Sequence, residues 1–301
     1  MARLPSILQN QIEALAGQLL APPGVPRPDF AAPPGEPALL PPDSVSWRVF
    51  DNPVTLFIGG IAAVLLELGE PRIRHGVWDH SDFRTNPLAR MQRTGLAALV
   101  TVYAPESQAR AMIAGVTRAH GGVTGTTPAG EAYSASDPDL LDWVGATALY
   151  GFMEAYSGYD RPLSSADKDR VFAEGQVTAG LYGATGAPDS AAGWEALLDR
   201  MRPRLEPSET LLEFLAIMRR VPALPAAARP LQHVLIRAAV DILPPGIAAQ
   251  LRIADRGLRP LERPLVQTAA RTAGAILIRN WPSVAACRRL GLPDDWLQRR
   301  D

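Results

Sequence analysis

The sequence predicts a single globular all-α domain preceded by an extended, proline-rich N-terminal arm. Apolar residues recur at helical spacing over most of the chain after Pro53, and runs of alternating β-branched residues are nearly absent. Prolines crowd residues 22–42, where they favour extended backbone because each lacks an amide donor. We therefore divide the 301 residues into an N-terminal helix and arm (1–46) and an all-α domain (47–301).

The elements follow from local signals. Residues 1–20 have the pattern of a short amphipathic helix, and the glycine-rich gap 121–136 predicts a loop or hairpin. Helix starts are marked by Asn86 before Pro87, by Asp137 before Pro138 and by Ser164 three residues before Asp167. Helical periodicity predicts helices over 54–69, 87–103, 106–120, 138–157, 164–182, 190–202, 207–220, 224–241, 245–256, 261–280 and 283–290.

Composition excludes several classes of protein. Thirty basic residues balance 31 acidic ones, so the chain lacks the overall basic excess of a nucleic-acid-binding protein. A single cysteine, Cys287, excludes an intrachain disulfide and a cysteine-based zinc cluster. The most apolar run, 54–66, is shorter than the roughly 20 residues of a membrane span, and no signal-peptide pattern is present. We expect a cytoplasmic protein without a membrane span.

Common catalytic motifs are absent. The sequence contains no phosphate-binding loop, dinucleotide-binding fingerprint, nucleophile elbow, H-E-x-x-H zinc motif or C-x-x-C-H haem-attachment motif. These absences remove many enzyme classes without identifying one.

His120 continues the apolar face of the helix predicted over 106–120 and is followed by a glycine-rich segment. A neutral imidazole on an apolar wall, beside glycines that let a flat ligand approach, suits the single axial ligand of a haem iron. A core or helix-capping histidine fits the same spacing, which alone favours that simpler interpretation. The apolar residues that precede His120 on this face are Ala109, Met112, Ile113 and Val116.

The helix predicted over 87–103 carries Arg90, Arg93 and Thr94 on one side and apolar residues on the other. Two arginines beside an apolar wall can bind carboxylates, including the propionates of a porphyrin. The alternative is a solvated face paired with Asp79 or Asp82.

Two further groups are candidates for chemistry. The stretch Asp79-His80-Ser81-Asp82 places a histidine between carboxylates, as in a catalytic triad, although neighbours in one loop cannot all face one another. A capping role fits them better. Cys287 lies beside two arginines that would lower the pKa of a thiolate, but a buried structural thiol is the simpler interpretation.

The order of several segments resembles the rubber-oxygenase or MpaB-type family, which includes latex-clearing proteins and a fungal oxygenase that shortens a farnesyl chain. The resemblance covers Trp47 to Gly183 and is weak beyond it. No single segment is diagnostic, but the ordered set is specific. The segments include Trp47-Arg48-Val49, Gly59-Gly60, His80-Ser81-Asp82-Phe83, Pro87-Leu88-Ala89-Arg90, Arg93-Thr94, Val116 to His120, Tyr133 to Leu141, Trp143-Val144 and Leu181-Tyr182-Gly183.

The resemblance implies a non-covalent haem b in an all-α fold. It places His120 at the position of the axial iron ligand, and Arg90, Arg93 and Thr94 on the distal side. It further implies activation of O2 to oxidise an apolar or isoprenoid-like substrate, including cleavage of a carbon–carbon double bond. On this basis we predict Arg93 and Thr94 as catalytic residues, and His120, Arg90 and Thr94 as haem-binding residues.

The chain departs from the family at three positions. Arg93 stands where rubber oxygenases have a lysine, and an arginine is not expected to coordinate iron. Glu70 and Gly145 stand where many members have histidines, which puts the substrate and the reaction in question. Two alternatives therefore stay open: a non-catalytic haem-binding sensor or carrier, and a cofactor-free helical protein that binds an apolar ligand or a partner. The sequence does not determine the oligomeric state.

Overall fold

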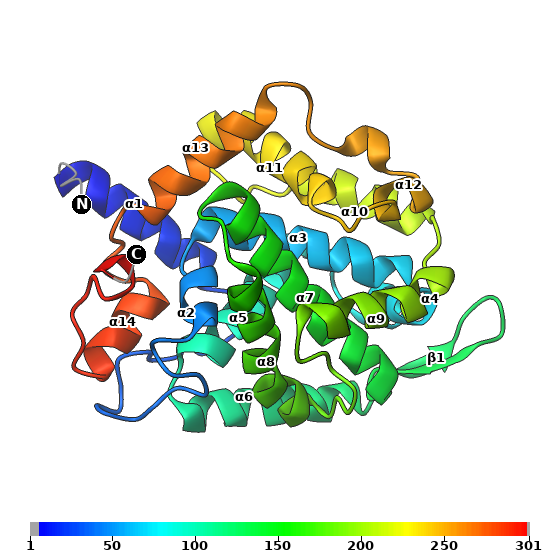
Figure 1. Ribbon diagram of the computed structural model, residues 1–301, viewed down its shortest axis with the longest axis horizontal. Helices are drawn as coiled ribbons and strands as arrows, with labels where there is room; N and C mark the ends of the chain where they lie inside the picture. Colours follow the sequence, from blue (N-terminus) through cyan, green and yellow to red (C-terminus); the bar gives the residue numbers. More distant parts are fainter. Residues whose placement is uncertain (1–5, 300–301) are drawn as a thin grey trace.

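The computed structural model describes residues 6–299. This part of the chain forms fourteen α-helices, four short 3₁₀ turns and one two-stranded hairpin (Figure 1). The all-α fold class is therefore confirmed. Residues 1–5 of the predicted N-terminal helix and residues 300–301 of the predicted domain lie outside the described residues.

Two long helices, α3 (Pro53–Gly69) and α7 (Pro138–Tyr159), cross at the centre of the molecule and run in opposite directions. Their backbones touch at Gly59 and Gly151, since a Cβ atom on Gly59 would lie 2.7 Å from the Gly151 carbonyl oxygen. Only glycine permits this approach. Further along the crossing, Trp143 Nε1 donates a hydrogen bond to the Leu66 carbonyl at 3.4 Å. The helix pair therefore fixes which side chains of α3 and α7 face each other.

The remaining helices cover the two sides of this pair. On the lower side in Figure 1 lie α5 (Pro87–Tyr103), α6 (Glu106–His120), α8 (Ser165–Tyr182) and α9 (Ala191–Met201). On the upper side lie α10 (Glu209–Arg220), α11 (Arg229–Asp241), α12 (Ile247–Gln250) and α13 (Glu262–Gly274). A hairpin of β1 (Thr124–Thr126) and β2 (Ala132–Ser134) projects at one end.

Helices with clear start signals agree with the prediction. Both α5 and α6 have the predicted bounds, and α8 begins after Ser164, whose Oγ accepts a hydrogen bond from the Asp167 amide at 3.1 Å. The α1 helix (Ser6–Leu19) and the hairpin also lie in the predicted segments.

Several segments differ from the prediction. A helix that was not predicted, α4 (Pro71–His80), is capped by Glu70, an unusual capping residue, whose carboxylate accepts from the Ile73 amide at 3.0 Å. The helix predicted over 245–256 reduces to α12 and a 3₁₀ turn, because Gly246 and Arg252 have φ angles of 82° and 56°. The one predicted over 224–241 starts only at Arg229, and the one predicted over 261–280 ends at Gly274.

The proline-rich arm has no regular secondary structure between residues 20 and 44, as predicted. It is tied to the body by Arg289 at the end of α14 (Pro282–Arg289). The Arg289 guanidinium donates to the carbonyls of Phe30 at 2.6 Å, Glu36 at 2.8 Å and Tyr103 at 2.9 Å. Phe30 and Leu40 of the arm are buried, and the short helix α2 (Val45–Val49) follows it. The arm thus lies against the all-α body, and the boundary at residue 46 stays a prediction.

Within the described residues, no single helix has the length and apolar character to cross a membrane. Helices α3 and α4 meet such a criterion only when taken together, and the chain bends by 111° between them.

Candidate functional site

Among the four histidines, only His120 has a buried ring nitrogen without a partner among the described residues. Its Nδ1 atom is buried, and no described residue forms a hydrogen bond to it. Burial, and secondly repulsion by the charge of Arg90, lower the pKa of His120, so its ring is neutral at pH 7. The other three have partners: His75 with Asp79 at 2.9 Å, His80 with Tyr133 at 3.0 Å, and His233 with the Arg219 carbonyl at 3.2 Å.

The last turns of α6 point His120 inward, as its helical spacing predicted. Ala109 and Ile113 on the same face are buried, and Met112 packs against the core. Thr117, one turn before His120, also has a buried Oγ1 without a partner among the described residues. Because buried polar atoms are normally hydrogen-bonded, two unpaired ones on adjacent turns indicate a place for a ligand.

Arg90 connects α5 to His120. Its guanidinium donates to Thr94 Oγ1 one turn later, as the spacing predicted, and Thr94 Oγ1 donates to the Arg90 carbonyl at 3.0 Å. Burial lowers the pKa of Arg90, which is still charged at pH 7, and Glu67 is the acid that acts on it most strongly. Arg90 is half-buried, whereas Thr94 is exposed.

Arg93 has a different partner. Its guanidinium forms an ion pair with Asp82, which is one of the pairings that the solvated-face alternative predicted. The Arg93 side chain is 34% exposed. The structure therefore brings Arg90, Thr94 and His120 into one neighbourhood and turns Arg93 toward the segment after α4.

Glu67 of α3 is a site residue that the sequence analysis missed. It is half-buried and lies beside Arg90 and Thr147 of α7, whose hydroxyl donates to the Val144 carbonyl at 3.0 Å. Burial raises its pKa to about 7, against the opposing effects of Arg90 and Thr147. The sequence contained a pattern that indicates this position. Gly59, Ala63 and Glu67 follow one another at intervals of four residues and therefore share the α3 face that meets α7. The carboxyl can thus gain or lose a proton near neutral pH.

The two positions where the family has histidines have different surroundings. Glu70 is buried, and its carboxylate binds Arg72 at 2.8 Å and Arg204 at 3.0 Å while it caps α4. It therefore holds three segments together. At Gly145, a Cβ atom would meet nothing within 4 Å, so the space that a side chain would fill is open.

Two other sequence candidates do not form reactive sites. Asp79 and His80 end α4 instead of lying in a loop, and the partners of His80 and Asp82 lie in different segments, so no triad forms. Cys287 is buried, and burial raises the pKa of its thiol to about 12. The hypothesis of a lowered thiolate pKa is therefore wrong, and the simpler structural interpretation is confirmed.

A haem fits the chemistry of the residues around His120. Among residues 6–299, no group of three or more histidine, cysteine, aspartate or glutamate side chains could hold a metal ion. A haem iron asks for one protein ligand, since the porphyrin supplies four nitrogens. His120 offers a neutral imidazole, and Arg90 a cation of the kind that binds propionates.

Most of the chain matches one family model. Residues 47–276 match a family model described as "ER-bound oxygenase mpaB/B'/Rubber oxygenase, catalytic domain". The chain therefore belongs to this family, as the resemblance predicted, and the match extends past Gly183 into the loop after α13. Neither the curated proteins nor the solved structures contain a match to the chain.

Proposed function

We propose that the protein is a haem b-dependent oxygenase that uses O2 to oxidise an apolar, isoprenoid-like substrate, including cleavage of a carbon–carbon double bond. The observation that supports this most directly is the buried, unpartnered Nδ1 of a neutral His120. When bound, haem b supplies the redox-active iron that dioxygen chemistry requires.

In this proposal, His120 would hold the haem iron. Its ring is already neutral at pH 7, so no proton has to leave before the imidazole binds a metal. Its place at the end of α6, on the same face as buried Ala109 and Ile113, keeps the ring away from bulk water.

Arg90 and Thr94 hold the cofactor. The half-buried guanidinium of Arg90 binds a propionate carboxylate, and its contact with Thr94 fixes its direction. Arg93, three residues later, is held by Asp82. It contributes positive charge beside Arg90, and its guanidinium offers hydrogen-bond donors but no iron ligand.

Glu67 holds or moves a proton. With a pKa of about 7, it exists in both protonation states at neutral pH, which is the condition for efficient general acid–base catalysis. Thr147 of α7 lies beside the carboxyl and favours its charged form. This group favours an enzyme over a sensor or carrier, because carriage of haem needs no acid–base residue.

The proposal is tested by loading the purified chain with hemin and recording its visible spectrum. We expect a Soret band in the wild type, its loss or a marked shift in His120→Ala, and no change in the control His75→Ala, whose ring is paired with Asp79. Absence of the band, or an identical band in His120→Ala, would favour the cofactor-free alternative. Oxygen consumption with a panel of alkenes then separates an oxygenase from a carrier.

A further inference from the structure

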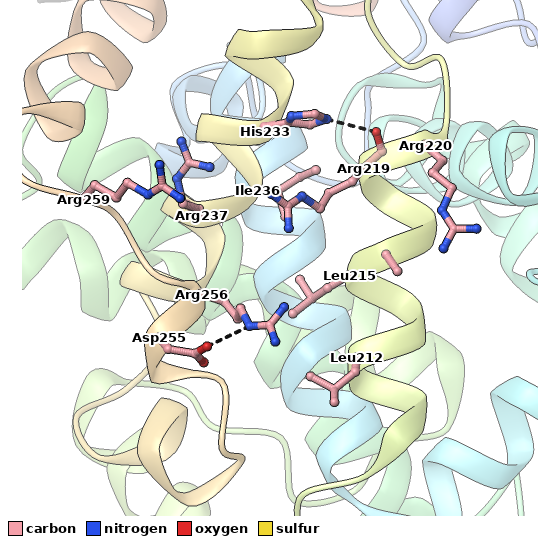
Figure 2. A pocket seen from close by; sticks show the side chains of 11 residues that line it. Leu212, Leu215, Arg219, Arg220, His233, Ile236, Arg237, Asp255, Arg256 and Arg259 are labelled. Atoms are coloured by element: carbon pink, nitrogen blue, oxygen red, sulfur yellow. Dashed lines mark hydrogen bonds and ion pairs between the residues drawn. The ribbon is translucent and has the colours of Figure 1, made fainter.

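A hollow of about 240 Å³ lies on the upper side of the molecule, between α10, α11 and the segment that follows α12 (Figure 2). None of the predicted haem-site residues lines it. Leu215 and Ile236 form a buried apolar floor, and Leu212 stands at its wall. The rim is cationic and includes Arg219, Arg220, Arg237, Arg256 and Arg259.

The positive charge of this rim is only partly neutralised. Asp255 binds its neighbour Arg256 at 2.9 Å, and Glu262 binds Arg237 at 2.8 Å. For Arg219 and Arg220, no ion pair to a described residue is present. Residues 219–263 contain eight arginines and three acids, whereas the whole chain has a net charge of −1. The balanced composition therefore conceals a concentrated basic surface.

Exposed leucines border the same surface. Leu261 is 89% exposed, Leu265 is 50% exposed and Leu212 is 43% exposed. Leu261 and Leu265 are one turn apart at the start of α13 and share a face. Glu262, the residue after Leu261, accepts from the Arg259 amide at 2.9 Å and binds Arg237, and both arginines line the hollow, so Leu261 is close to it along the chain.

The backbone of Leu261 is also strained. Its φ angle is 71°, in the left-handed region that costs a side-chain-bearing residue about 1–2 kcal/mol. Among the described residues, Arg252 in the same segment is the only other non-glycine residue with a positive φ. A strained turn that presents a leucine to water is the arrangement expected where the leucine meets an apolar phase.

We propose that this face, made of the arginine-lined hollow with Leu261 and Leu265, docks on the surface of an anionic phospholipid bilayer. The leucines enter the interface, and the arginines bind lipid phosphates. A free phosphate or a nucleic acid would satisfy the arginines but would leave the leucines in water. The docking does not depend on haem, and it would bring the catalytic domain to the phase in which apolar substrates dissolve.

The test is co-sedimentation of the full chain with vesicles of phosphatidylcholine alone and with an equimolar mixture of phosphatidylcholine and phosphatidylglycerol. We expect binding to the mixed vesicles that weakens with salt, and little binding to the neutral ones. Replacing three cations, as Arg219→Gln/Arg220→Gln/Arg259→Gln, should lower the partition coefficient about a hundredfold. Leu261→Asn should lower it about tenfold, and asparagine tolerates the left-handed backbone, so folding is preserved.

Matched controls lie on the other side of the molecule. Val177→Asn replaces an exposed residue of α8, and Arg200→Gln an exposed arginine of α9, and both should bind as the wild type does. Circular dichroism verifies that each variant is folded. Equal binding to neutral vesicles, or unchanged binding by the arginine and leucine variants, would overturn the proposal. Binding of inorganic phosphate without vesicles would assign the hollow to a small anion, and preferential binding of duplex DNA would assign it to a nucleic acid.

Discussion

Glu67 and Glu70 lie three residues apart at the end of α3, yet their carboxyl groups have opposite surroundings. Both lose hydration on folding, which raises the pKa of each. At Glu70, hydrogen bonds from Arg72, the Ile73 amide and Arg204 outweigh burial, and the pKa falls below its usual value. At Glu67, Arg90 and Thr147 offset burial only in part, and the pKa rises to about 7.

The difference separates a structural carboxylate from a reactive one. Glu70 has three partners on two segments, Arg72 and the Ile73 amide in α4 and Arg204 after α9, so its negative charge contributes to the stability of the fold. Glu67 and His120 are both affected by the charge of Arg90, and the buried Nδ1 of His120 has no partner among the described residues. Of the five buried polar side-chain atoms without a partner among the described residues, two lie on adjacent turns of α6, and this pair marks the candidate site.

The largest effect expected from this comparison is on stability. Glu70→Gln leaves the cations of Arg72 and Arg204 without their buried partner and should lower the free energy of unfolding by about 3 kcal/mol at pH 7. Because the folded-state pKa of Glu70 is lowered, this contribution is present above the unfolded pKa of about 4.5 and disappears as the pH falls through the folded value. Urea unfolding of the wild type and the variant measures the loss of stability at pH 7 and its disappearance at pH 3.

The control for Glu70→Gln is Glu213→Gln, which removes an exposed ion pair with Arg84. Its cost should stay below about 0.5 kcal/mol. Equal losses in the two variants would show that Glu70 is not a structural junction.

Replacing Glu67 is expected to change the free energy of unfolding by a smaller amount and in the opposite direction. Its folded pKa is raised from 4.5 to about 7, so the protonated form stabilises the fold below pH 4.5, and this stabilisation is lost as the pH rises to 7. Glu67→Gln keeps a neutral group at every pH. It should therefore raise the free energy of unfolding by about 2 kcal/mol at pH 8 and leave it unchanged at pH 4. A destabilised variant at pH 8 would contradict the assignment of Glu67 as a site residue.

The smallest effect concerns the pKa of Glu67 itself. Arg90 stabilises the charged carboxylate, so Arg90→Gln should raise the pKa of Glu67 by about 1. Infrared difference spectra of the protonated carboxyl group, recorded across a pH titration, measure this value. Arg93→Gln serves as the control, because Arg93 is paired with Asp82 and should leave the Glu67 titration in place. Identical titrations in both variants would place Arg90 outside the site.

Local signals in the sequence predicted most of the helices. Ser164, Asn86 and Asp137 mark helix starts that depend only on neighbouring residues, and the structure has helices there. The start of α4 could not be read in this way, because Glu70 caps it with a side chain rarely used for capping. The end of α13 depends on packing, since a Cβ atom on Gly274 would lie 2.8 Å from Asp160 Oδ2.

The site was predictable only in part. The spacing along α6 identified His120, and the spacing along α5 identified the pair of Arg90 and Thr94. Glu67 ends an apolar run, where a charged residue normally indicates the return to solvent. Its proximity to Arg90 and Thr147 arises from contacts between α3, α5 and α7, which no local pattern encodes.

The contact between Gly59 and Gly151 has a consequence for how members of such a family can diverge. The backbones of α3 and α7 touch at Gly59 and Gly151, so neither glycine can be replaced by a larger residue without moving the helices apart. We call this line of contact between α3 and α7 the seam. Glu67 and Thr147 lie on this seam, two turns from Gly59 and one turn from Gly151. New substrate preferences must then arise on α5 and α6 and at open positions such as Gly145, where added volume meets empty space.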